Sequence, residues 1–121
     1  MFVPDLRNTK VVIVVWAQHG CPACDKYLPQ LTERIETHQA TYGTPFHVWS
    51  PGEPIGEGEI LVLFYDAASK NDELQDYADK LGVKATPSTY LLTRHGVHKI
   101  EGAIPDDQID TLLNAAYHAN A

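Results

Sequence analysis

The chain has 121 residues, of which 44% are apolar and 21% charged, a composition typical of globular proteins. This length predicts a single domain, residues 1–121, whose hydrophobic core needs no disulfide to fold. Nine basic and sixteen acidic residues give a net charge of −7, which argues against non-specific binding to nucleic acid or to an anionic membrane. Two cysteines are too few for a disulfide-rich scaffold or a four-cysteine zinc site.

The amino end has no charged region followed by a long apolar stretch, and the apolar run Val11–Trp16 is too short to cross a bilayer. We therefore expect a cytoplasmic protein without a signal peptide. In a reducing compartment, two cysteines are more often catalytic, metal-binding or inert than structural.

Two apolar runs predict the central strands. Val11–Trp16 is rich in β-branched residues and predicts a strand buried on both faces, and Ile60–Tyr65 predicts a second. A strand, a helix and a strand in this order predict a right-handed βαβ unit with parallel strands. The helix between them is indicated by apolar residues at helical spacing: Cys24, Leu28, Leu31 and Ile35.

The segment 41–59 holds three prolines and four glycines, which excludes a regular helix or a central strand. Phe46–Trp49 within it predicts a short edge strand. We expect 41–59 to be an extended loop or an edge-strand insertion. The alternative is a partner-recognition surface built on Phe46 and Trp49.

The second half of the chain predicts a helix, a hairpin and a last helix. Ser69 is the expected N-cap of the first of these helices, and Gly82 its end. Ser88–Arg94 and Val97–Glu101 flank His95-Gly96, which predicts an antiparallel hairpin. Pro105 opens the last helix. The order βαβαββα predicts an α/β fold, a mixed central sheet with helices on both faces. The apolar helix faces are Leu74, Tyr77, Ala78 and Leu81, and Ile109, Leu112, Leu113 and Ala116.

The two cysteines form a Cys-x-x-Cys pair where the first strand meets its helix. Residues at i and i+3 are neighbours on a helix, so the two sulfurs can close a small ring. Cys21 falls at the helix start, where free backbone N–H groups and the helix dipole stabilise a thiolate and lower the pKa of the thiol. Cys24 falls on the buried face. We therefore expect Cys21 to be the nucleophile and Cys24 to resolve the mixed disulfide.

Three other interpretations of the cysteines, a metal site, a structural disulfide and inert thiols, have less support than thiol–disulfide exchange. A metal site needs two more ligands, and a structural disulfide that closes four residues removes little chain entropy. Inert cysteines would not need to occupy a strand-to-helix turn. We expect no metal and no cofactor. The six histidines are scattered rather than paired at ligand spacing: His19, His38, His47, His95, His98 and His118.

Four pieces of the sequence resemble the thioredoxin family. Trp16–Cys24 resembles its active-site segment, with Trp-Ala shortly before Cys-x-x-Cys, and Pro29 matches the proline that kinks the following helix. Val83–Pro87 resembles the segment that ends in the family's cis-proline, and Gly102 resembles a glycine at the end of the last strand. The resemblance implies a thioredoxin-like fold, a redox-active disulfide Cys21–Cys24, and electron transport by protein thiol–disulfide exchange.

The resemblance also implies a substrate groove built from Trp16, Thr86, Pro87 and Gly102, in which the backbone of Thr86 holds an extended substrate segment. The implied partners are protein disulfides and a thioredoxin reductase or another thiol reductant, with the chain acting as a monomer. We expect a reductase. The alternatives are a glutaredoxin-like or oxidase use of the same couple, and a non-catalytic binding module on the same fold.

Several features depart from the family's pattern. Pro22-Ala23 stands between the cysteines, with the proline first as in glutaredoxins, and leaves the direction of electron flow open. Val14 stands where thioredoxins bury an aspartate that handles the proton of the resolving cysteine, so water or another group must take that task. About ten residues precede Val11, which suggests a short variant that lacks the first strand and helix.

His19, two residues before Cys21, is the local candidate for modulating the pKa of the thiol. As a cation it would lower that pKa, and as a neutral imidazole it would pass protons. The alternative is an exposed loop histidine.

Overall fold

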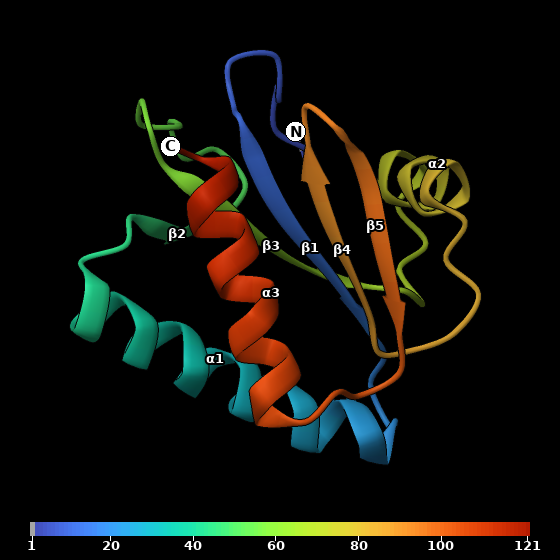
Figure 1. Ribbon diagram of the computed structural model, residues 1–121. Helices are drawn as coiled ribbons and strands as arrows, with labels where there is room; N and C mark the ends of the chain where they lie inside the picture. The colour runs from blue at the N-terminus through green and yellow to red at the C-terminus, as the bar shows by residue number, and fades with distance from the viewer. Residues whose placement is uncertain (1) are drawn as a thin grey trace.

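A five-stranded mixed β-sheet forms the centre of the fold, and helices cover both of its faces (Figure 1). The computed structural model describes residues 2–121. The strands lie in the order β2-β3-β1-β4-β5. In chain order the elements are β1 (Val11–Ala17), α1 (Pro22–Tyr42), β2 (Phe46–Val48), β3 (Ile60–Asp66), α2 (Asp72–Leu81), β4 (Ser88–Thr93), β5 (Gly96–Glu101) and α3 (Asp106–Ala119).

The register of the central strands fixes where α1 begins. β1 pairs in parallel with β3 and antiparallel with β4. Ala17, the last residue of β1, lies opposite Asp66, the last residue of β3. Because the carboxyl ends of parallel strands meet at one edge of a sheet, the chain enters α1 beside the end of β3 and the start of β4 (Figure 1).

The two faces of the sheet carry different cores because successive side chains of a strand point to opposite sides. Ile13 and Val15 of β1 pack with α1 and α3, while Val14 and Trp16 pack with α2. The α1–α3 face is mainly aliphatic. The α2 face is richer in large aromatic side chains: Trp16, Trp49, Tyr65, Tyr77 and Tyr90.

The fold class is as predicted, an α/β thioredoxin-like arrangement with a mixed sheet. The structure adds β2 to the expected order, so the elements run βαββαββα. The predicted N-cap Ser69 is wrong: the N-cap of α2 is Asn71, whose side-chain oxygen accepts the Leu74 N–H at 3.1 Å. On α1 the buried face includes Tyr27, whereas Leu28 is only half-buried.

The first two residues of the segment 41–59 belong to the last turn of α1. Gly43, with φ of +64°, is the C-cap that ends this helix. β2 then pairs in parallel with β3 at the edge of the sheet, as expected for an edge strand. Phe46 and Trp49 are each only 7% exposed, and the Trp49 indole N–H donates to the Glu53 carbonyl at 3.0 Å. Both aromatics therefore belong to the core, and the alternative of a recognition surface built on them is wrong.

The residues before β1 pack against α2. The backbone N–H groups of Phe2 and Val3 donate to the Glu73 carboxylate, and the Tyr65 hydroxyl donates to the Phe2 carbonyl. Within residues 2–121, β1 is the first regular element. No helix in that described range is long and apolar enough to cross a membrane.

Candidate active site

The two cysteines lie at the amino end of α1, and the chain turns sharply to reach it. The Cys21 N–H donates to the Gln18 carbonyl at 3.2 Å, and Gly20 adopts a φ of +80°, a conformation that favours glycine. Cys21 is the N-cap of α1: its Sγ accepts the Cys24 N–H at 3.2 Å. Pro22 occupies the first turn, where a missing N–H costs no helical hydrogen bond.

This geometry makes the two free thiols unequal. Hydrogen bonds from Cys24, from the Thr86 hydroxyl and from the backbone N–H groups of Cys24 and Ala23 stabilise the Cys21 thiolate and lower the pKa of its thiol. Burial and the bond to Cys21 raise the pKa of Cys24, which is 1% exposed. Cys21, by contrast, is only partly buried. The arrangement therefore provides one accessible nucleophile and one shielded thiol.

A segment distant in sequence faces the nucleophile. The Thr86 carbonyl oxygen and the Thr86 hydroxyl each lie 3.8 Å from the Cys21 sulfur. The Thr86–Pro87 peptide bond is cis. The Gly102 N–H donates to the Pro87 carbonyl at 2.8 Å, and Gly102 has a φ of +82°. Thr86 therefore contacts Cys21, and the Pro87–Gly102 hydrogen bond joins the start of β4 to the end of β5 behind it.

Two contributors were not found from the sequence. The Thr86 hydroxyl, rather than its backbone alone, contacts the Cys21 sulfur. The Gln30 side chain donates to the Ile104 carbonyl at 3.3 Å and to Asp106 at 2.8 Å, which ties α1 to the loop that follows Gly102 and to the start of α3. Neither contact leaves a local signal, because each joins residues more than sixty positions apart.

A family model for the thioredoxin-like domain matches residues 6–117. The chain belongs to the thioredoxin-like family. A thioredoxin-like fold that carries a Cys-x-x-Cys pair indicates a thiol–disulfide redox function.

Solved structures support the fold assignment. An uncharacterised thioredoxin-like protein from Clostridium perfringens has a TM-score of 0.62 at 16% identity, over 91% of this chain and 73% of that one. Thioredoxin O2 from Arabidopsis thaliana has a TM-score of 0.60 at 13% identity, over 90% and 76%. Oxidised thioredoxin from Plasmodium falciparum has a TM-score of 0.57 at 16% identity, over 88% and 82%. At these identities the likeness shows a shared fold.

One curated relative shares a shorter segment. A protein of Schizosaccharomyces pombe that carries the name steryl acetyl hydrolase mug81 is 36% identical over 52 residues. The match covers 42% of this chain and 14% of that protein, so the thioredoxin-like chain spans only a small part of the relative's length.

The structure corrects the role expected for Trp16 in this thioredoxin-like site. Its side chain is 1% exposed and packs against Tyr65 and Tyr77, with ring centroids 5.1 and 5.9 Å apart. Strand alternation turns Trp16 into the α2 face of the core, so its side chain does not line a substrate groove.

His19 is exposed, in keeping with the alternative of a loop histidine. It is not among the groups that lower the pKa of the Cys21 thiol. Instead it borders a hollow of about 320 Å³ on the Cys24 side of the dithiol. Across residues 2–121, no group of three or more histidine, cysteine or acidic side chains is placed to hold a metal ion.

Proposed function

We propose that this thioredoxin-like chain is a protein thiol–disulfide oxidoreductase that reduces disulfides in protein substrates. The inequality of the two thiols carries the proposal. Cys21 is accessible at a helix start with a lowered pKa, whereas Cys24 is buried with a raised one. Since the thiolate is the attacking species, Cys21 reacts first and Cys24 second.

The reaction runs in two displacements. The Cys21 thiolate attacks one sulfur of the substrate disulfide, forms a mixed disulfide and releases the first substrate thiolate. The Cys24 thiolate then attacks the Cys21 sulfur, forms the Cys21–Cys24 disulfide and releases the second. The substrate gains two electrons and takes up two protons, and the cysteine pair loses two electrons. A thiol reductant, such as a thioredoxin reductase, must then reduce the new disulfide.

Thr86, Pro87 and Gly102 are the proposed substrate-binding residues. Thr86 presents its carbonyl beside the reacting sulfur, and an extended substrate backbone can donate to it. Pro87 has no N–H to compete for that segment. Gly102 has no side chain to obstruct the approach to Cys21 from its side.

The direct test is the reduction of insulin disulfides by the purified chain with a dithiol as electron donor. We expect turnover that is lost in Cys21→Ser. The Cys24→Ser variant should accumulate disulfide-linked substrate complexes, because the mixed disulfide can form but not be resolved. Absence of both turnover and trapped complexes would contradict the proposal. A biological role that persists in the Cys21→Ser, Cys24→Ser double variant would favour the binding module.

The reducing direction is a separate part of the proposal. Pro22-Ala23 between the cysteines influences the reduction potential, and family potentials span more than 100 mV. We expect a couple more reducing than glutathione when it is equilibrated with glutathione buffers of graded ratio. A potential well above that of glutathione would instead indicate a glutaredoxin-like or oxidase role.

We also propose that residues 1–121 form one domain that acts as a monomer in the cytoplasm, a reducing compartment that suits a dithiol reductant. Sedimentation equilibrium should give the mass of a single chain, and cell fractionation should place the protein with cytoplasmic markers. A dimer mass, or enrichment in an oxidising compartment, would contradict these two points.

A further inference from the structure

The Cys24 thiol must lose a proton before it can attack, and the structure limits where that proton can go. Cys24 is 1% exposed, and burial is the main cause of its raised pKa. Val14 of β1 is fully buried, has no proton-accepting side chain, and lies opposite Leu63 and Tyr90. On the Cys21 side, the Thr86 hydroxyl donates to the Cys21 sulfur, and Thr86 and the Gln18 backbone also form hydrogen bonds with Cys24, but neither of them is a base.

The other side of Cys24 opens into the hollow of about 320 Å³. Its lining brings ionisable groups from α1, from β3 and from the loop before α1 to the same space as Cys24, and its volume admits several water molecules. The titratable residues that line it besides Cys24 are His19, Asp25, Tyr65 and Asp66.

We propose that Asp66, acting through water in this hollow, accepts the proton of Cys24 during resolution of the mixed disulfide. This inference rests on the proposed function, since it concerns its second displacement. In the step, the S–H bond of Cys24 breaks and its proton passes through water to the Asp66 carboxylate. The Cys24 sulfur then bonds to the Cys21 sulfur, and the substrate leaves as a thiolate that takes a proton from solvent.

Asp66 is held in place better than the other candidates. It ends β3 opposite Ala17, and the Ala67 N–H donates to the Ala17 carbonyl at 2.7 Å. One carboxylate oxygen accepts the Ala68 N–H at 2.8 Å, which leaves the second oxygen free for water. Asp66 therefore presents a fixed acceptor at the rim of the hollow.

The remaining groups are less suitable. Asp25 lies in the first turn of α1, and no hydrogen bond holds its carboxylate within the described residues. The Tyr65 hydroxyl already donates to the Phe2 carbonyl, and burial raises its pKa, so it stays protonated. His19 and Asp66 are both exposed, but no hydrogen bond orients the His19 ring in the described structure, whereas the Asp66 carboxylate accepts the Ala68 N–H.

The test separates the two displacements by stopped flow with a chromogenic aromatic disulfide as the probe. The first burst of coloured thiolate reports attack by Cys21, and the second reports resolution by Cys24. Asp66→Asn should slow the second burst about ten-fold near neutral pH and leave the first unchanged. This is less than the roughly hundred-fold or more typical of a lost proton acceptor, because water in the hollow can still take the proton. The asparagine oxygen can still accept the Ala68 N–H, so the fold is preserved.

Two readouts distinguish proton transfer from a structural role. Asp66→Glu should restore most of the second rate, and raising the pH should erase the difference between Asp66→Asn and the unaltered chain, because hydroxide then deprotonates Cys24. Asp79→Asn is the matched control, since it removes one carboxylate that borders a different hollow beside Thr86. It should leave both bursts unchanged.

An unchanged second burst in Asp66→Asn, or equal slowing of both bursts, would overturn the inference. An equally large loss in Asp25→Asn alone would move the role to Asp25 and also overturn it. If Asp66→Asn slows only the second burst but the unaltered chain neither reduces insulin nor forms trapped complexes, the proposed function fails while the assignment of Asp66 stands. If no first burst occurs, both fail.

Discussion

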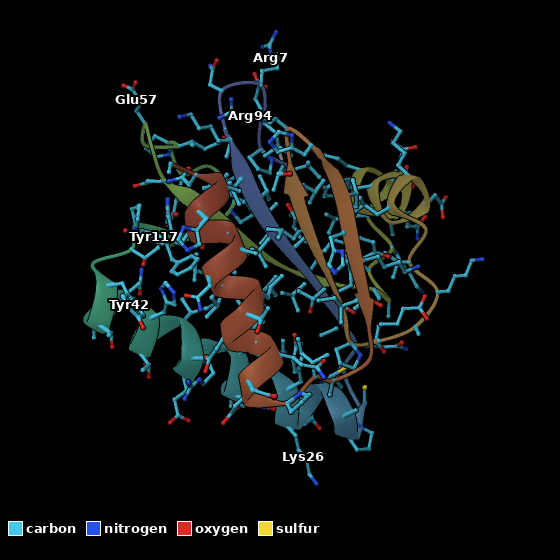
Figure 2. The ribbon with its side chains drawn as sticks, in the orientation of Figure 1. Arg7, Lys26, Tyr42, Glu57, Arg94 and Tyr117 are labelled. Atoms are coloured by element: carbon cyan, nitrogen blue, oxygen red, sulfur yellow. The ribbon has the colours of Figure 1, made fainter. Side chains whose placement is uncertain are left out.

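The dithiol end of the molecule is held by contacts between residues distant in sequence, whereas the segment that follows α1 is held by contacts between residues close in sequence. Figure 2 shows Lys26, near the start of α1, at the lower edge of the molecule and Glu57 at the upper edge. At the lower end, Thr86 reaches the Cys21 sulfur across 65 positions of sequence through contacts of 3.8 Å. In the segment that follows α1, which contains Glu57 and is called the upper end from here on, His47 lies between Glu53 and Glu59 at 2.8 and 2.7 Å, only 6 and 12 positions away.

The contacts around Cys21 serve reactivity, whereas the contacts around His47 serve the stability of the fold. Around Cys21 the stabilising groups are backbone N–H groups, a hydroxyl and a second thiol, which favour the thiolate and leave it accessible. Around His47 the charged groups satisfy one another, and they fix the loop that connects β2 to β3. We expect substitutions at the lower end to change chemistry with little effect on folding, and substitutions at the upper end to do the reverse.

Removal of the nucleophile should have the largest effect. Cys21→Ser is expected to abolish disulfide reduction, while its free energy of unfolding changes by no more than about 0.5 kcal/mol. Serine is a good N-cap and can accept the Cys24 N–H in place of the sulfur. Insulin reduction and urea denaturation measure the two quantities. A loss of stability comparable with that of a core truncation would contradict the expectation that the dithiol end contributes to reactivity and not to folding.

At the upper end, Glu59→Gln should weaken the fold without affecting activity. Burial lowers the pKa of His47, but its hydrogen bonds and charge interactions with Glu53 and Glu59 outweigh burial and raise it overall. This contribution to stability is therefore complete below the pKa of an unfolded histidine, about 6.5, and is lost as the pH rises through the folded value. In acid it is lost again as the pH falls through the lowered pKa values of the two glutamates.

We expect Glu59→Gln to lose about 0.5 kcal/mol between these limits and less above the pKa of His47, because the pair is partly exposed and screened. Urea denaturation at about pH 6 and at alkaline pH measures the difference. Glu57→Gln is the control, since Glu57 points into solvent in Figure 2. Equal losses at both pH values would mean that His47 protonation does not contribute.

Thr86→Val should have a smaller effect, confined to reactivity. The change removes the hydroxyl that stabilises the Cys21 thiolate and keeps a β-branched side chain, so the pKa of Cys21 should rise. At a pH below that pKa, alkylation of Cys21 by iodoacetamide should slow about two- to three-fold, as for the loss of one weak hydrogen bond. Thr86→Ser, which keeps the hydroxyl, should retain the original pH profile. An unaltered profile in Thr86→Val would show that the hydroxyl contributes nothing.

His19→Ala should have the smallest effect on Cys21. Since His19 is not among the groups that lower the pKa of that thiol, the midpoint of Cys21 alkylation should stay where it is. A rise in the midpoint would instead support His19 as a modulator of the thiol pKa. Either result is compatible with the position of His19 at the edge of the hollow beside Cys24.

The strands and helices with strong local patterns were predictable. The β-branched runs of β1 and β3 and the stripe on α1 specify buried elements, and Cys21, Pro22 and Cys24 specify a reactive helix start without reference to the rest of the chain. The N-cap of α2 was misplaced because Ser69 and Asn71 both suit a cap, and only the path of the chain after β3 selects Asn71. The prediction that Trp16 lines the substrate groove was wrong because the motif fixes the position of Trp16 along the chain but not the face of the sheet to which its side chain points.

By itself, the sequence determined the fold class, the positions of the main elements and the unequal roles proposed for the two cysteines, because periodicity and helix-end chemistry act over a few residues. Only the tertiary structure decided what surrounds those cysteines. The Thr86 hydroxyl beside Cys21, the burial of Trp16 and the hollow that joins Cys24 to Asp66 all depend on strand register and on loops that meet from distant parts of the chain. Two cysteines are too few for a disulfide framework, and the local sequence around them predicts a redox pair instead. Which groups stabilise the Cys21 thiolate and accept the proton of Cys24 depends on their neighbours in the fold.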